Sequence, residues 1–150
     1  MEQKSFLKRT AIPVLLAIVL VTGIQLMPRA LPAALIPPSG DTYLCRVTLL
    51  EEGIVSQTLD LTAQESMTLR TFLQTARVQH RGQTGDITDR HPLLYQMTFT
   101  PVGEGETCEL LLDPEGRLFA GGKLYKLQGA NPQELAETVQ GYLSAGAATP

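Results

Sequence analysis

The feature that most constrains this chain is an apolar run at residues 11–27, in which only Thr22 and Gln25 are polar. Three cations among the first ten residues precede this run. At about 1.5 Å per residue, a helix made of the run would be about 25 Å long, slightly less than the roughly 30 Å hydrocarbon core of a bilayer. The run therefore predicts an N-terminal hydrophobic helix that lies outside the main folded unit.

Two interpretations of the run compete, a retained transmembrane anchor and a cleaved signal peptide. A signal peptide ends in a small-x-small cleavage site. The candidates at residues 21–23 and 33–34 lie inside the run or close to prolines. We therefore predict a transmembrane anchor over residues 11–27. Secretion after cleavage is the alternative, and a buried helix of a soluble protein is the third interpretation.

Charge divides the chain at about residue 40. The first 40 residues hold four Lys or Arg and one Glu, a net charge of +3, whereas the other 110 hold eight cations and fourteen carboxylates, a net charge of −6. Cations concentrate on the cytoplasmic side of membrane segments. This bias places residues 1–10 in the cytoplasm, residues 28–42 in a proline-rich tether, and residues 43–146 in the extracytoplasmic domain of a single-pass cell-membrane protein. An acidic domain also argues against nucleic acid as a partner.

The domain is large enough for one hydrophobic core. The chain is 43% hydrophobic and 18% charged, which is typical of a folded protein rather than a disordered one. About 110 residues bury a single core. This size excludes an enzyme with separate cofactor and substrate domains.

Alternation of apolar and polar residues predicts a β-hairpin at the start of the domain. Tyr43, Cys45 and Val47 share one face of a strand with period two. A Glu-Glu-Gly turn then leads to a second strand at residues 54–61, and Gly53 can adopt the positive φ that such a turn needs.

A helix and four more strands are expected after the hairpin. Thr62 and Glu65 have the spacing of a capping box, and the apolar residues behind them predict a helix to about Val78. Asn131 then has the position of a cap for a final helix that ends near Gly146. The remaining segments are a polar loop at residues 79–90 and strands at residues 93–102, 107–112, 117–120 and 123–127.

The predicted fold class is therefore α+β. Short turns between the strands favour antiparallel pairing. The expected architecture has two layers, an antiparallel sheet with two helices on one face, in the order β-β-α-β-β-β-β-α, preceded by the hydrophobic helix.

Cys45 and Cys108 fall on the apolar faces of two predicted strands. If these strands are neighbours, a facing pair has a Cα separation that suits a disulfide. The alternative is two buried free thiols that act as small apolar side chains. The sequence leaves both readings open, and it lacks the CxxC or Cys/His spacing of a metal site.

The predicted loop at residues 79–90 and the residue after it hold the densest polar chemistry of the chain. Imidazoles and carboxylates are metal ligands and general bases, but their spacing here fixes no ligand geometry. A solvated loop is the default interpretation, with a protein-binding loop and a metal-dependent or hydrolytic site as alternatives. The residues concerned are His80, Arg81, Asp86, Asp89, Arg90 and His91.

Catalytic motifs are not recognisable in the sequence. The serines lack the context of a nucleophile elbow. Gly121-Gly122-Lys123 lacks the rest of a phosphate loop and is typical of a tight reversal between strands. We therefore predict a protein that is not an enzyme and that has no catalytic, cofactor-binding or metal-binding residues.

The second half of the domain carries a resemblance to a known class of domains. It is found in the segment Pro92-Leu-Leu-Tyr95, in Phe99, in residues 110–112 and 122–125, and in the final helix. Together these features resemble small uncharacterised extracytoplasmic domains of Gram-positive bacteria that follow an N-terminal anchor or signal. The resemblance covers about residues 43–143 and implies the α+β plan without a function.

The sequence thus favours a membrane-anchored extracytoplasmic domain that serves in binding, sensing or regulation. Its expected partners are the membrane, through residues 11–27, and a protein of unknown identity. The alternatives are a secreted hydrolase-like or metal-dependent enzyme that uses residues 80–91, and a structural subunit of a membrane complex.

Overall fold

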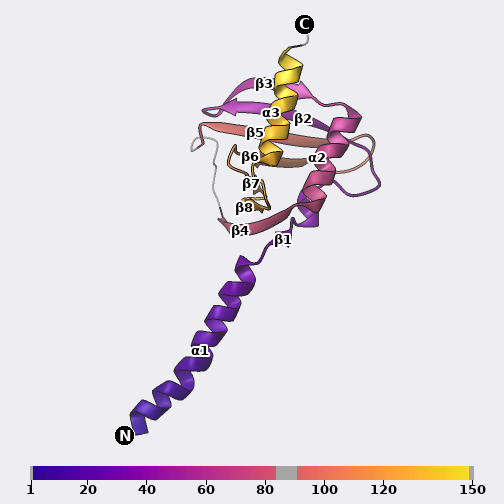
Figure 1. The fold of residues 1–150 in the computed structure, drawn as a ribbon. Helices are drawn as coiled ribbons and strands as arrows, with labels where there is room; N and C mark the ends of the chain where they lie inside the picture. Colours follow the sequence, from indigo (N-terminus) through magenta and orange to yellow (C-terminus); the bar gives the residue numbers. More distant parts are fainter. Residues whose placement is uncertain (1, 84–90, 149–150) are drawn as a thin grey trace.

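The computed structural model describes residues 2–83 and 91–148. These residues form an α+β domain with one antiparallel sheet of eight strands, in the order β1-β4-β8-β7-β6-β5-β2-β3 (Figure 1). The elements along the chain are α1 (Glu2–Leu26), β1 (Arg29–Ala30), a 3-10 turn η1 (Ala33–Leu35), β2 (Tyr43–Glu51), β3 (Ile54–Asp60), α2 (Ala63–Thr75), β4 (Arg77–Gln83), β5 (Leu93–Pro101), β6 (Cys108–Leu112), β7 (Arg117–Ala120), β8 (Lys123–Gln128) and α3 (Glu134–Ala147). The α+β class and the antiparallel pairing are as the sequence predicts.

Two tight hairpins set the register of the sheet. Glu52 and Gly53 connect β2 to β3 with φ angles of 52° and 78°, and Gly121 and Gly122 connect β7 to β8 with φ angles of 55° and 73°. Two successive positive φ angles are the signature of a type I′ turn, whose twist matches that of the flanking strands. Both reversals predicted from the glycines are confirmed.

Helix α2 begins at the predicted capping box. The Thr62 hydroxyl accepts a hydrogen bond from the Glu65 backbone N–H, and the Glu65 carboxylate accepts one from the Thr62 backbone N–H. The helix ends at Thr75, three residues earlier than predicted, because Ala76 adopts an extended conformation that leads directly into β4. Val78 is apolar and buried as a strand residue, which explains why it also matched the helical pattern.

Helix α3 begins three residues after the predicted cap. The Asn131 side chain accepts a hydrogen bond from the Gln133 backbone N–H at 3.1 Å, and the Asn131 carbonyl accepts one from Glu134 at 3.2 Å. Asn131 therefore forms a turn before the helix. Leu135 and Val139 on the first turns of α3 are buried.

The main core lies between the sheet and the helices α2 and α3. Figure 1 shows both helices on the same side of the sheet, and their buried residues join one apolar cluster with alternate residues of the strands. Leu69 of α2, Val139 of α3 and Val47 of β2 are each 0% exposed in this cluster. A smaller cluster of Leu50, Leu94 and Phe119 is separate from the main one, and strand alternation places it on the opposite face of the sheet.

The predicted order of elements omits β1 and β4. The structure contradicts the predicted loop at residues 79–83, which belong to β4, whereas residues 84–90 lie outside the described residues. β4 has the sequence RVQHRGQ, and Val78 is its single fully buried residue. The strand forms because its backbone pairs with β8, so no alternation of apolar side chains marks it in the sequence.

The segment between α1 and β2 contributes to the domain. β1 pairs with β4 through Arg29↔Val78 and Ala30↔Arg77. Leu31 and Ile36, on either side of η1, are 4% and 7% exposed and belong to the main core cluster.

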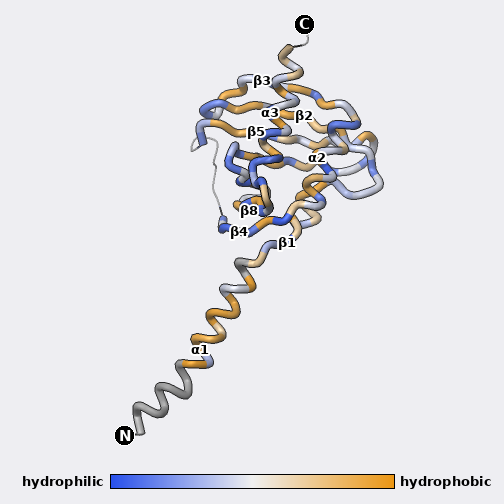
Figure 2. Tube along the Cα trace, viewed as in Figure 1, coloured by the Kyte–Doolittle hydropathy of each residue, from blue (hydrophilic) through white to orange (hydrophobic). Residues whose placement is uncertain are grey.

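Helix α1 projects away from the sheet (Figure 1) and is largely hydrophobic in its second half (Figure 2). Its residues 12–24 are exposed. Within the part of the chain that the structure describes, no helix is both long and apolar enough to span a bilayer. This finding contradicts the predicted transmembrane anchor at residues 11–27 and the single-pass membrane location inferred from it.

The disulfide that the sequence left open as a possibility is contradicted, because Cys45 and Cys108 are free. Cys45 of β2 pairs with Phe99 of β5, and Phe99 pairs on its other side with Cys108 of β6. The two cysteines are therefore two strands apart, at about 9–10 Å, whereas a disulfide needs Cα atoms within about 7 Å. Burial raises the pKa of the Cys45 thiol to about 12, so this side chain is a protonated core residue.

Candidate functional site

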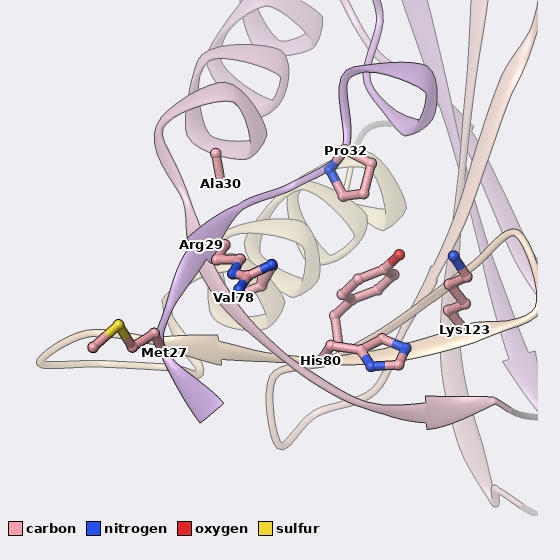
Figure 3. A pocket seen from close by; sticks show the side chains of 8 residues that line it. Met27, Arg29, Ala30, Pro32, Val78, His80 and Lys123 are labelled. Carbon is pink, nitrogen blue, oxygen red and sulfur yellow. The ribbon is translucent and has the colours of Figure 1, made fainter. Parts of the chain in front are cut away.

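A cavity of about 390 Å³ opens where β1, β4 and β8 meet, next to the end of α1 (Figure 3). Its lining combines basic, aromatic and apolar side chains from segments that are far apart in the sequence. The lining residues are Met27, Arg29, Ala30, Pro32, Val78, His80, Lys123 and Tyr125. A volume of this size is within the range of small-molecule sites, about 300–1,000 Å³.

The sheet positions one wall of the cavity. His80 of β4 and Tyr125 of β8 are partners across the two strands, and their rings meet edge-on with centroids 5.7 Å apart. Tyr125 is only 4% exposed, and burial raises the pKa of its phenol. The hydroxyl therefore stays protonated near neutral pH and keeps its hydrogen-bond donor.

Lys123 reaches the same wall from the start of β8. It follows the Gly121-Gly122 turn and pairs with Gln83 of β4. Residues 123 and 125 are two apart in a strand, so their side chains lie on the same face of the sheet. The alternation of side chains along β8 therefore places Lys123 on the same face as Tyr125 and its partner His80.

Arg29 lines the cavity from β1, which lies on the other side of β4 from β8. Pairing with Val78 fixes its backbone, and its guanidinium donates a hydrogen bond to the Ile24 carbonyl at 2.9 Å. Ile24 lies in the last turn of α1, where carbonyl groups lack partners within the helix. A guanidinium has five N–H donors in a planar fork, so this one contact uses a fraction of its capacity.

The cavity is basic in a chain that is acidic overall. Its lining includes the basic side chains of Arg29 and Lys123 and the imidazole of His80, and none of the described residues that line it carries a carboxylate. The whole chain, in contrast, has a net charge of −3. The cavity is therefore a local concentration of positive charge, which attracts anions.

A second cavity, of about 510 Å³, lies over β2, β3 and β5. Its charged residues neutralise each other, because Arg46 binds Asp60 with an Nε–Oδ1 distance of 2.6 Å. The hydrogen bond from Arg46 lowers the pKa of the Asp60 carboxyl group. Because these two charges are already paired, this cavity presents no net charge to a ligand, in contrast to the β1-β4-β8 cavity.

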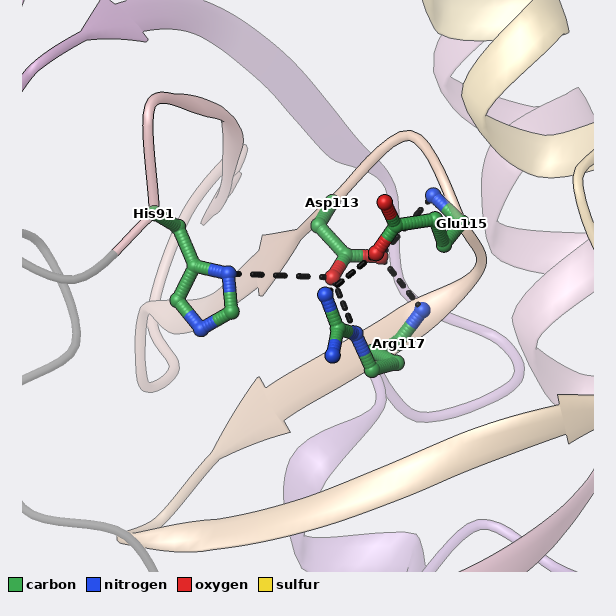
Figure 4. A network of polar contacts seen from close by, with 4 residues as sticks. All are labelled: His91, Asp113, Glu115 and Arg117. Carbon is green, nitrogen blue, oxygen red and sulfur yellow. Dashed lines mark hydrogen bonds and ion pairs between the residues drawn. The ribbon is translucent and has the colours of Figure 1, made fainter.

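A buried carboxylate forms the other polar constellation of the domain (Figure 4). Asp113 is 1% exposed and begins the turn between β6 and β7. Its Oδ1 accepts hydrogen bonds from the backbone N–H groups of Glu115 and Arg117, at 3.0 and 2.8 Å, and its Oδ2 accepts one from Arg117 Nε at 2.5 Å. The Arg117 guanidinium also binds the Glu115 carboxylate.

His91 approaches the same carboxylate from the segment before β5. Its Nδ1 lies 4.0 Å from Asp113 Oδ2, which is too long for a hydrogen bond, and its ring packs against Phe119 with centroids 5.1 Å apart. A carboxylate that orients a catalytic imidazole would hold it at hydrogen-bond distance. Asp113 instead accepts hydrogen bonds from backbone groups of the β6–β7 turn, so we interpret this network as structural, as a clasp that holds the turn together.

The structure separates the polar residues that the sequence groups together. His80 lines the cavity, whereas His91 contacts Phe119, which pairs with Leu124 and points to the face opposite that of Tyr125. Arg81 is exposed at an irregularity of the β4–β8 pairing. The candidates Asp86, Asp89 and Arg90 lie outside the described residues.

The described residues contain no group of three or more His, Cys, Asp or Glu that could hold a metal ion. The alternative of a site shared by both imidazoles requires His80 and His91 on one side of the sheet. They lie on opposite sides, because strand alternation separates the residues that each ring contacts.

Sequence reasoning missed Arg29, Lys123 and Tyr125 as site residues. Arg29 was visible as a lone cation after the apolar run, and Lys123 as the residue after two glycines. Their meeting depends on the pairing of β1 with β4 and of β4 with β8, which neither local pattern encodes.

No protein-family model, curated protein or solved structure matches this chain.

Proposed function

We propose that this protein is a non-catalytic binding domain with a regulatory or sensing role, and that its ligand occupies the β1-β4-β8 cavity. The observation that carries the proposal is the cavity itself: an opening of about 390 Å³ in which polar donors and apolar side chains converge. Small-molecule sites have this composition, with a few placed polar groups among apolar walls.

Binding explains the cavity better than catalysis does. None of its described lining residues carries a carboxylate or a thiol. Carboxylates and thiols are common groups in general acid–base and nucleophilic catalysis. The lining offers donors that hold a ligand, which is what a binding site requires.

The proposal is tested by blocking the cavity with a larger side chain. His80 is exposed at its rim, so His80→Trp adds bulk there without disturbing the core. The matched control is Ser56→Trp, which places the same indole at an exposed position of β3, at the opposite edge of the sheet. Both variants of the full chain and the unmodified chain are screened against a library of small molecules by thermal unfolding.

A ligand present at about 100 times its Kd stabilises the folded state by about 2.7 kcal/mol, which raises the melting temperature measurably. We expect at least one compound to stabilise the unmodified chain and the Ser56→Trp variant but not the His80→Trp variant. A compound that stabilises all three equally binds elsewhere and contradicts the assignment. Chemical conversion of the bound compound would contradict the non-catalytic role.

A further inference from the structure

We propose that the ligand of the β1-β4-β8 cavity is a small organic anion, whose phosphate or carboxylate group binds Arg29, Lys123 and His80 while its apolar part lies along Tyr125 and the remaining walls. This inference rests on the proposed binding function and names the chemical class of the ligand. It requires that a negative charge on the ligand, and not only the shape of the ligand, determines which molecules bind.

The polar residues of the cavity are donors that match an oxyanion. Arg29 offers a planar fork that binds phosphate or carboxylate oxygens in pairs, and Lys123 offers a compact point charge. The protonated hydroxyl of Tyr125 adds a neutral donor. A cationic ligand would meet two positive charges without a compensating carboxylate from the described lining residues.

Arg29, like Arg70, donates to a backbone carbonyl, whereas two other arginines of the domain bind carboxylates. Arg46 and Arg117 bind the carboxylates of Asp60 and Asp113. Arg29 donates instead to the neutral carbonyl of Ile24. A guanidinium can donate two parallel hydrogen bonds to a carboxylate or phosphate, so an anion in the cavity offers Arg29 a bidentate contact that the single Ile24 carbonyl oxygen does not.

The dimensions of the cavity indicate an organic anion rather than an inorganic one. A volume of about 390 Å³ exceeds that of a bare phosphate ion several-fold, since one water occupies about 30 Å³. Met27, Pro32 and Val78 supply apolar surface beside the basic residues. A ligand with a charged group at one end and a ring or short chain at the other covers both parts of the lining.

Binding of such an anion also involves the connection to α1. Met27, Arg29 and Pro32 belong to the segment that follows α1, whereas His80, Lys123 and Tyr125 belong to the sheet. A ligand that contacts both groups of residues adds to the pairing of β1 with β4, which already holds this segment at the sheet edge.

The test is isothermal titration of the full chain at low ionic strength and pH 7 with three probes that share a benzene ring. Phenyl phosphate and benzoate carry the two candidate anionic groups, and benzamide is the neutral counterpart of benzoate. The variants are Lys123→Gln and Arg29→Gln. The matched control is Lys126→Gln, which removes the same charge from an exposed position of β8 whose side chain points to the other face of the sheet.

We expect saturable binding of phenyl phosphate, benzoate or both, and the tighter of the two identifies the anionic group. Loss of one charge-assisted contact in Lys123→Gln or Arg29→Gln should weaken binding about tenfold, and Lys126→Gln should change it less than about twofold. Added salt should weaken binding, since it screens exposed charges.

Three results would overturn the anion assignment. The first is that neither anion binds. The second is that Lys126→Gln weakens binding as much as Lys123→Gln does, which would indicate attraction to the general surface. The third concerns the neutral probe. If benzamide binds as tightly as benzoate and His80→Trp prevents it, the anion assignment fails while the proposed binding function stands. If binding of every probe survives His80→Trp, the proposed function fails with it.

Discussion

Removal of the Asp113 carboxylate should destabilise the domain, because this one side chain holds the turn between β6 and β7. Asp113 is buried and accepts three hydrogen bonds, from the backbone N–H groups of Glu115 and Arg117 and from the Arg117 guanidinium. Asp113→Ala removes all three acceptor contacts. Neutral hydrogen bonds contribute about 0.5–1.5 kcal/mol each and charged ones about 1.5–3 kcal/mol.

The Glu115 N–H and part of the Arg117 guanidinium regain water in the variant, since both residues are partly exposed. We therefore expect a loss of about 3 kcal/mol in the free energy of unfolding. Asp113→Asn keeps one oxygen for the two backbone donors and loses the ionic contact with Arg117, so its expected cost is about half as large. The hydrogen bonds of the carboxylate therefore predict that Asp113→Ala is less stable than Asp113→Asn.

The assay is urea unfolding of the full chain, followed by far-ultraviolet circular dichroism. For an m-value of about 1–3 kcal/mol per molar urea, a loss of 3 kcal/mol lowers the midpoint by about 1–3 M. Asp60→Ala is the matched control, because it removes a carboxylate that also binds an arginine but is exposed, and exposed ion pairs contribute little. Equal midpoints for Asp113→Ala and Asp60→Ala would refute the interpretation of the network as a structural clasp.

Two further predictions concern the turn and the cysteines. Gly116→Ala should lower the free energy of unfolding by about 3 kcal/mol or more, because a Cβ at residue 116 would lie 2.1 Å from the Pro132 carbonyl oxygen. Gly103→Ala is the control: a Cβ there meets nothing within 4 Å, so this variant should show only the smaller cost of a positive φ. Similar losses for both variants would mean that the loop before α3 does not pack on this turn. Iodoacetamide at pH 8 should modify Cys108 faster than Cys45, because burial raises the pKa of Cys45 to about 12 and leaves almost no thiolate at that pH. Mass spectrometry of Cys45→Ser and Cys108→Ser variants measures the two rates separately, and an intramolecular disulfide formed by the folded, oxidised chain would contradict the strand order β6-β5-β2.

The parts of the fold that local chemistry determines could be predicted from the sequence. Thr62 and Glu65 satisfy each other's backbone groups within one turn, and Gly53 and Gly121 permit positive φ angles within two residues. Each of these signals is complete in a short window. The capping box and the two hairpins were therefore found.

The parts that depend on pairing between distant strands could not be predicted. β4 is almost entirely polar and forms because β8 offers it backbone partners, so its sequence favoured a loop. The separation of Cys45 from Cys108 depends on β5 lying between their strands. Alternation predicted which face each cysteine occupies, but it contains no information on strand order.

The candidate site illustrates the same limit. His80 stood out in the sequence because of nearby polar residues, but the structure groups it with Arg29, Lys123 and Tyr125 instead. β1, β4 and β8, which carry these residues, are tens of positions apart in the sequence and come together through two strand pairings. Residue type identified a candidate, and long-range topology decided its neighbours.

The most direct test of the binding site is a nuclear magnetic resonance titration of the ¹⁵N-labelled full chain with phenyl phosphate. The proposed site predicts that the largest, saturable shifts occur at the backbone amides of Arg29, Val78, His80, Lys123 and Tyr125, which line the cavity from three strands. Lys123→Gln should reduce these shifts at a given concentration of phenyl phosphate. Shifts centred instead on β2, β3 and β5, or spread over all exposed cations without saturation, would contradict the assignment of the β1-β4-β8 cavity as the ligand site.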